Sequence, residues 1–141
     1  MVDFSNIKKA DVSEASLVKY ELSQLEGDMC LTLAPATDAN KAYLNAVLKR
    51  SKMLSRGKVN NVTADMIIEN RNNDKKLYAE HIIKEWNVVD VNGAEVEFNK
   101  ENVSAFLDAL PNYIFDEIRI FAANPVNFTN GSVNIEDETK N

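Results

Sequence analysis

The chain has 141 residues, a net charge of −6 at pH 7 and an isoelectric point near 4.8. Apolar residues make up 45% of it and charged residues 27%, the ordinary composition of a single globular domain. The acidic balance excludes a generally basic nucleic-acid binder, and no apolar run approaches the roughly 20 residues that a transmembrane helix needs.

The N-terminal part predicts a β-hairpin preceded by an arm. Residues 1–16 have no regular pattern, and we expect a loose arm with at most one helical turn, starting at Ser13. Apolar and polar residues then alternate over 18–22 and again over 29–33, which is the period of half-buried strands. The glycine-containing segment 26–28 separates the two runs and supplies the turn.

A first helix is expected over residues 38–55. Pro35 ends the preceding strand, and Thr37 stands where an N-cap residue would stand. Gly57 is placed to end the helix. The apolar residues of its predicted face are Leu44, Val47, Leu48 and Leu54.

A second helical pattern covers residues 64–86, with Thr63 as its N-cap. Its centre, 70–74, is polar and poor in helix propensity. Two alternatives follow: one long helix with a weak centre, or two helices with a break near 72–73. The apolar residues at helical spacing in its last turns are Ala79, Ile82, Ile83 and Trp86.

Residues 88–98 predict a second β-hairpin. Two alternating runs flank Asn92-Gly93, and this dipeptide favours a two-residue type I′ turn because both central positions need positive φ.

The C-terminal part predicts two helices and a tail. Asn99 caps a helix that Pro111 closes, and a last helix covers 112–123. The segment 129–141 is polar and acidic, and we expect it to be disordered. The chain is therefore predicted to be an α+β protein, mostly helical, with four to five helices and two β-hairpins that form a small antiparallel sheet. Its single domain is expected over 17–128.

Catalytic and metal-binding signals are weak. His81 is the only histidine and Cys30 the only cysteine, and they are far apart in sequence, so a zinc site with three or four ligands at characteristic spacing is not expected. A lone cysteine also cannot form an internal disulfide, which favours a reducing compartment. The glycines are isolated and form no phosphate-binding loop. We expect no catalytic residue and no cofactor.

One concentration of basic residues stands out in this acidic chain. Lys49, Lys52 and Arg56 fall on one face of the helix 38–55 and form a candidate basic patch. Aromatic residues that could stack on bases do not interleave with it. The patch is interpreted as an ordinary solvated face, with phosphate contacts and an acidic protein surface as the alternatives.

The helix 112–123 is apolar on more than one side, which indicates either a central core helix or a surface shared with a partner. Tyr113 and Ile120 lie outside its main stripe, and burial and a partner interface both remain open for them. The candidate partner-binding residues are Tyr113, Ile114, Phe115, Ile118, Ile120 and Phe121.

The segment 79–128 combines Trp86, a turn at Asp90 and Gly93, the pair Phe98-Asn99 and the break Leu110-Pro111. This combination resembles the tail assembly chaperones of long-tailed bacteriophages. Such proteins have a helix ending in Trp, a glycine turn, a Phe-Ser/Asn-x-Glu-Asn segment, a Leu-Pro break and a final helix near Asn-Phe. The segment 31–37 is also similar to their N-terminal hairpin. The matching residues here are Trp86, Asp90, Gly93, Val96, Phe98, Asn99, Glu101, Asn102, Leu110, Pro111, Asn127 and Phe128. Structural roles are expected for Trp86, Gly93, Phe98 and Asn99.

This resemblance implies a non-enzymatic protein of the host cytoplasm that is absent from the mature virion. Its implied partners are the tape measure protein and the major tail tube protein, whose subunits it would recruit during tail assembly. Homo-oligomerisation remains open, and neither a membrane nor nucleic acid is an expected partner.

Two other functions remain open. A small tail-completion or head–tail joining protein of the virion would share this size and class. A nucleic-acid-binding regulator would use the basic patch of Lys49, Lys52 and Arg56.

Overall fold

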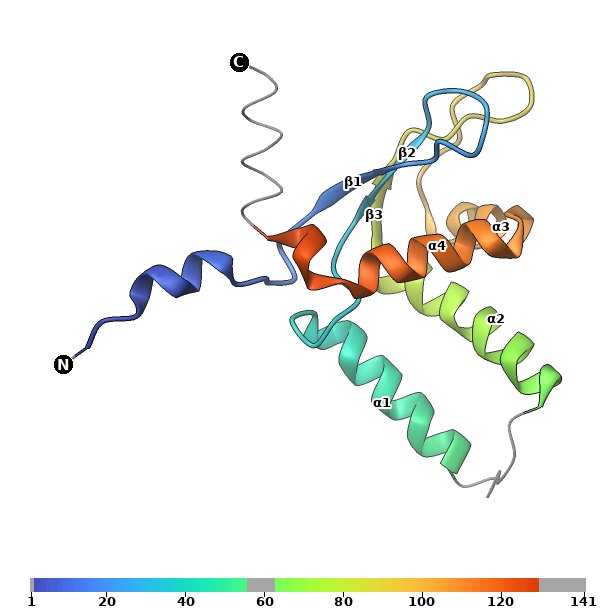
Figure 1. Ribbon diagram of the computed structural model, residues 1–141. Helices are drawn as coiled ribbons and strands as arrows, with labels where there is room; N and C mark the ends of the chain where they lie inside the picture. The colour runs from blue at the N-terminus through green and yellow to red at the C-terminus, as the bar shows by residue number, and fades with distance from the viewer. Residues whose placement is uncertain (1, 56–62, 130–141) are drawn as a thin grey trace, which may run out of the picture.

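A computed structural model describes residues 2–55 and 63–129 of the chain (Figure 1). The α-helices in order are α1 (Lys41–Ser55), α2 (Ala64–His81), α3 (Lys100–Ala109) and α4 (Asn112–Ala123). The strands are β1 (Val18–Glu21), β2 (Cys30–Leu33) and β3 (Ile83–Trp86). Two 3₁₀ helices, η1 (Ser5–Ala10) and η2 (Pro125–Phe128), complete the described elements. The predicted α+β class is confirmed.

The three strands form one antiparallel sheet with β2 in the centre. Val18 on β1 lies opposite Leu33, and Tyr20 lies opposite Leu31. On the other side Leu31 lies opposite Trp86, and the register shifts between Thr32 and Leu33. The central strand is the best buried, because Leu31 and Leu33 are both 0% exposed.

The helices cover one end of this sheet. Figure 1 shows α4 crossing beside the strands, while α1 and α2 project away from them as a pair. Backbone hydrogen bonds fix the segment after β2: Ala34 N–H donates to Ile82 O, and Ala36 N–H donates to Ala122 O, both over 2.8 Å. The core therefore lies where the sheet, the end of α2 and the inner face of α4 meet. Its central side chains are Leu31, Leu33, Tyr78, Ile82, Leu107, Phe115, Ile118 and Phe128.

The prediction of a helix over 64–86 is wrong at the C-terminal end of that range. The helix α2 runs without a break through 72–73 and ends at His81, after which Ile83–Trp86 form β3. The apolar spacing fits a helix, but the free edge of β2 lies in the core, where its backbone groups need partners. Pairing with β3 supplies these hydrogen bonds, and this tertiary requirement overrides the local pattern.

The second hairpin is shorter than predicted and uses another turn. Val89 and Glu95 form a single bridge outside the sheet. Gly93 N–H donates to Asp90 O over 3.0 Å, and Asp90 N–H donates to Ala94 O over 2.8 Å, so the loop has three residues instead of two. Gly93 supplies a left-handed position, with φ at 79°. A three-residue loop that ends in a left-handed glycine is the second common hairpin solution.

The beginning of α1 also differs from the prediction. Thr37 Oγ1 accepts a hydrogen bond from Ala39 N–H in a turn, and the helix starts only at Lys41. Asn40 is the actual cap, since its Oδ1 accepts from Tyr43 N–H. Thr63 caps α2 as predicted, accepting from Met66 N–H. Gly57, which was expected to end α1, lies outside the described residues.

At the chain ends, η1 occupies part of the predicted arm, and Ser16 N–H donates to Ser13 O in a separate turn. The helix predicted over 112–123 coincides with α4. The short η2, which begins at Pro125, was not predicted, although it places Phe128 in the core. The predicted disordered segment 129–141 lies outside the described residues except for Thr129.

Candidate partner-binding surface

The helix α4 separates its apolar side chains onto two sides. It begins directly after the break at Leu110–Pro111, and Ile114 and Phe115 N–H both donate to the carbonyl of Pro111. Ile114, Phe115 and Ile118 are at most 1% exposed and belong to the core. These three residues are not available to a partner, so their assignment as binding residues is corrected. The reason is that their side chains pack into the hydrophobic core together with residues of the sheet, α2 and α3.

Tyr113 and Ile120 lie on the outside of α4. Their exposed fractions are 59% and 73%, which removes burial as the explanation for these apolar residues. They are seven residues apart, so two helical turns bring them nearly into line. Glu117 lies between them and is contacted by Gln24 of the hairpin loop. We call Tyr113, Glu117 and Ile120 the outer face of α4.

Phe121 occupies an intermediate position. It is half-buried, and its ring makes edge-to-face contacts with Tyr20 at 5.0 Å and with Phe128 at 5.9 Å between centroids. Such pairs add stability beyond area burial. Phe121 therefore joins α4 to β1 and η2.

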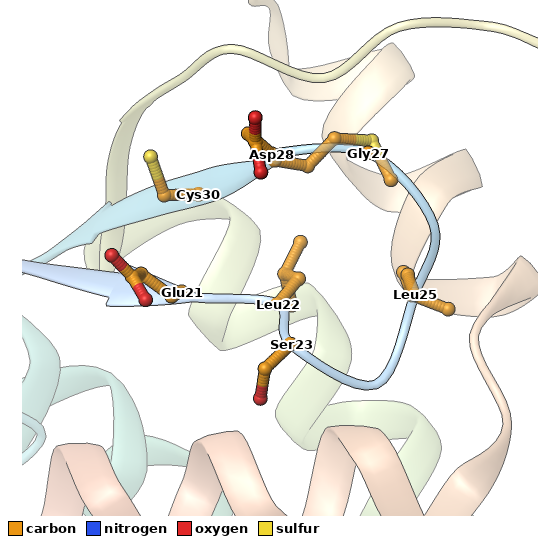
Figure 2. Close-up of a pocket in the computed structure, with 8 residues that line it drawn as sticks. Glu21, Leu22, Ser23, Leu25, Gly27, Asp28 and Cys30 are labelled. Carbon is orange, nitrogen blue, oxygen red and sulfur yellow. The ribbon is translucent and has the colours of Figure 1, made fainter.

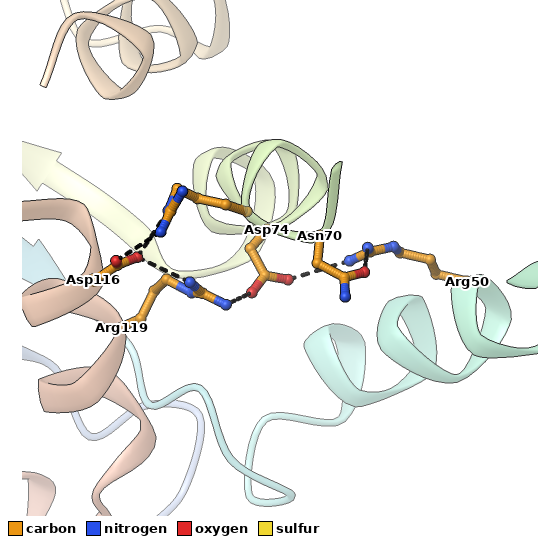
Figure 3. Close-up of polar contacts among 6 residues, drawn as sticks. Arg50, Asn70, Asp74, Asp116 and Arg119 are labelled. Atoms are coloured by element: carbon orange, nitrogen blue, oxygen red, sulfur yellow. Dashed lines mark hydrogen bonds and ion pairs between the residues drawn. The ribbon is translucent and has the colours of Figure 1, made fainter. Parts of the chain in front are cut away.

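A chain of alternating charges fixes α4 against α2 and α1 (Figure 3). Arg71 on α2 binds Asp116 through two hydrogen bonds, of 3.1 and 3.0 Å. Arg119 donates to Asp116 over 3.0 Å and to Asp74 over 2.7 Å. Arg50 on α1 then contacts Asp74 at 3.3 Å. Three helices are thereby held in one network, and the outer face of α4 is presented on a rigid support.

The network perturbs its own titrating groups. The hydrogen bonds from Arg71, and then those from Arg119, lower the pKa of Asp116. Burial, followed by the nearby Asp74 carboxylate, raises the pKa of Tyr43. Burial likewise raises the pKa of Tyr78. Both tyrosines therefore remain neutral and act as packing residues at the base of α1, where their rings meet edge to face.

The predicted basic patch is only partly visible. Lys49 is exposed on α1, whereas the side chain of Lys52 and all of Arg56 lie outside what the structure describes. The neighbouring Arg50 turns toward α2, where it contacts Asp74 and Asn70. This arginine therefore belongs to the support of α4 and adds no free charge to the patch.

The residues with predicted structural roles lie around Trp86. Its indole Nε1–H donates to Val96 O over 2.9 Å, which ties β3 to the second hairpin. The rings of Phe98 and Phe106 meet it edge to face at 5.5 and 5.4 Å. Asn99 Oδ1 accepts from Asn102 N–H at the start of α3. Trp86 and Phe98 remain partly exposed, so this cluster is a peripheral anchor outside the central core.

His81 lies at the end of α2, with Nε2 at 3.6 Å from the carboxylate of Glu80. Within 2–55 and 63–129, no three His, Cys, Asp or Glu side chains gather as metal ligands would. The described helices also include none that is long and apolar enough to cross a membrane.

The loop between β1 and β2 surrounds a hollow of about 430 Å³, in which Glu21 lies opposite Cys30 (Figure 2). The hairpin itself supplies the whole lining, and Leu22 contributes an apolar wall. Its lining residues are Glu21, Leu22, Ser23, Leu25, Gly27, Asp28, Met29 and Cys30.

Sequence reasoning missed the charged network. The only signal available was spacing: Asp116 and Arg119 are three residues apart, as are Arg71 and Asp74, so each pair shares a helix face. Charges at such spacing usually remain in solvent. Only the packing of α4 on α2 shows that these four face one another.

Comparison with known proteins gives one result. Residues 38–141 match the family model described as YdaY prophage protein. No curated protein and no solved structure matches the chain. The matched region includes all four helices, β3 and the outer face of α4, whereas β1 and β2 precede it. Since it covers well over half of the sequence, the chain belongs to the YdaY prophage protein family and is of phage origin.

Proposed function

We propose that this phage protein is a tail assembly chaperone. It binds the tape measure protein and recruits subunits of the major tail tube protein, without catalysis. It acts in the host cytoplasm and is left out of the mature virion. The phage origin of the family and the resemblance of residues 79–128 to such chaperones both support this role.

The exposure of Tyr113 and Ile120 carries the proposal. A helix whose inner face is fully buried has no structural need for two large apolar residues outside. Exposed apolar residues that align on a rigid helix are typical of protein-binding surfaces, and tyrosine is enriched among binding hot spots. A partner helix with an apolar stripe can pack against these two residues, helix against helix.

The charges of the chain suit the same role. A tape measure protein is a long helical chain whose apolar stripes make it prone to aggregate. Contacts from Tyr113 and Ile120 cover such a stripe, while the net charge of −6 makes coated complexes repel one another. Both effects keep the complex soluble until the tail tube subunits assemble.

Co-expression with the tape measure protein of the same prophage tests the proposal. We expect the tape measure to stay soluble and to co-purify with the wild-type chain. The double variant Tyr113→Ala/Ile120→Lys should lose both effects, because each change removes exposed contact area and leaves the core intact. The matched control is Val91→Lys, at a hairpin position that is 98% exposed.

Three results would contradict the proposal. The first is a tape measure that is equally soluble without this chain. The second is equal rescue by the double variant and the wild type. The third is a stoichiometric amount of the chain in purified virions, which would indicate a structural tail protein.

A further inference from the structure

A second surface feature lies between α2 and α3, away from the residues used above. It is a hollow of about 340 Å³ lined by Asn72, Lys75, Lys76, Ser104 and Asp108. Four of these five side chains carry N–H or O–H donors, and two of them are positively charged. The lining is therefore net positive in a chain whose overall charge is −6.

Lys75 is the unusual member of this lining. Only 7% of the residue is exposed, which is rare for a lysine. Its Nζ lies 3.9 Å from Asp108 Oδ1 and 5.9 Å from the centroid of the Phe115 ring. Among residues 2–55 and 63–129 it has no hydrogen-bond acceptor, although an ammonium group carries three donors.

These two contacts do not satisfy the ammonium group. A separation of 3.9 Å is too long for a hydrogen bond, and the Asp108 side chain is 71% exposed, so solvent screens the pair. A ring face attracts the charge without accepting a conventional hydrogen bond. The Lys75 side chain is mostly buried, but its ammonium group opens onto the hollow, where a bound anion would supply the acceptor that the described residues do not.

Arg119 gives a direct comparison, because it packs on the same Phe115 ring at 5.6 Å. Its guanidinium nevertheless donates to Asp74 and Asp116 over 2.7 and 3.0 Å. Contact with the ring thus does not prevent a cation from finding carboxylate partners. The N–H donors of the Lys75 ammonium group therefore remain available to a ligand in the hollow.

We propose that this hollow is a binding site for a compact oxyanion, either a phosphate or a carboxylate group. Lys75 is the principal donor, and Lys76, Asn72 and Ser104 surround the anion. Asp108 stays at the exposed rim, 3.9 Å from Lys75 Nζ. This inference goes beyond the proposed chaperone function and does not rest on it.

Nuclear magnetic resonance titrations of the full chain test the site. Sodium phosphate and sodium acetate are added separately at pH 7, with ionic strength held constant by sodium chloride. We expect saturable shifts of the backbone amides of Asn72, Lys76, Ser104 and Asp108 with at least one probe. Saturation by phosphate alone assigns free phosphate or a phosphorylated ligand, and saturation by acetate alone assigns a carboxylate. Saturation by both supports the shared chemistry.

The Lys75→Met variant should weaken binding by roughly tenfold or more, the size expected when a charged donor is lost. Lys84→Met is the matched control, since Lys84 is exposed on β3 outside the hollow and its loss changes the net charge equally. Ser104→Ala provides a second test that leaves Lys75 in place, and a smaller loss of affinity is expected.

Shifts that do not saturate with either probe would overturn the proposal. So would shifts that persist unchanged in both Lys75→Met and Ser104→Ala, or that Lys84→Met weakens as much as Lys75→Met does. If Lys75→Met fails to fold, the anion affinities of Ser104→Ala and Lys84→Met are compared instead. Weaker binding in Ser104→Ala than in Lys84→Met supports the site, and equal binding overturns it.

Discussion

Arg119 on α4 reaches Asp74 on α2 with a hydrogen bond of 2.7 Å, while its other terminal nitrogen holds Asp116 at 3.0 Å. One side chain thereby bridges two carboxylates that belong to different helices. Arg50 joins the same Asp74 from α1, so the three helices share this group (Figure 3). The outer face of α4 depends on this support, because α4 contacts α2 through both this network and the core.

Replacement of Arg119 by methionine should lower the free energy of unfolding by roughly 1–3 kcal/mol, because two partly buried carboxylates lose a charged donor. Urea unfolding followed by circular dichroism measures the change. Arg119→Lys keeps the charge, but an ammonium group cannot span both carboxylates as the planar fork does. We therefore expect it to restore only part of the loss, and full stability in Arg119→Lys would contradict the bridging role.

Acid should destabilise the protein through Asp116 and Glu80. Arg71 lowers the pKa of the Asp116 carboxyl and Lys100 lowers that of Glu80. Because each folded-state pKa lies below the unfolded value, the unfolded state binds more protons in the acid range. The stabilisation is complete above the unfolded pKa values, near pH 4, and is lost as pH falls through the folded ones.

Urea midpoints between pH 3 and pH 7 test this dependence. Asp116→Asn should be less stable than the wild type at pH 7 and should show a shallower rise of stability with pH. Glu26→Gln is the control, since Glu26 is exposed in the hairpin loop and makes no ion pair among the described residues. If the stability of Asp116→Asn rose with pH as steeply as that of the wild type, Asp116 would not be a source of the pH dependence.

The sequence predicted best those elements whose local signals agree with their tertiary surroundings. Asn99 and Pro111 delimit α3, and the stripe of α4 is wide enough to identify its buried side. By contrast, Ile82 and Ile83 fit a helix as well as a strand. The strand forms because its backbone pairs with β2, which is close in space but 50 residues away in sequence.

The candidate site was predictable in part for the same reason. Tyr113 and Ile120 stand apart from the main stripe of α4, and this spacing singled them out. Which of the six apolar residues is buried depends on the neighbours of α4, which no local pattern describes. The hollow around Lys75 was not predictable, since Lys75 and Ser104 come from separate helices and lysine is ordinarily a surface residue.

The turn at Gly93 gives a prediction about backbone strain. Its φ is 79°, and a Cβ atom placed there would meet nothing within 4 Å. Gly93→Ala should therefore cost only the penalty of the left-handed conformation, about 1–2 kcal/mol. Gly93→Asn should cost less, because asparagine tolerates this region. Equal stability of the alanine variant and the wild type in urea would show that the loop can adopt another turn.

Asn40 gives the sharpest test of how α1 is attached. Its Oδ1 accepts from Tyr43 N–H at 3.2 Å and caps the helix, while its Nδ2 donates to His81 O at 3.3 Å at the end of α2. The residue is only 3% exposed, so both groups depend on these partners.

Asn40→Ala removes both contacts and should lower the free energy of unfolding by roughly 1–3 kcal/mol. Asn40→Asp keeps the capping oxygen but places a negative charge beside the carbonyl of His81, where a donor is required. We therefore expect the aspartate variant to be no more stable than the alanine variant at pH 7, and to recover as acid protonates it. If capping alone mattered, Asn40→Asp would match the wild type, and the link between α1 and α2 through Asn40 would have no energetic role.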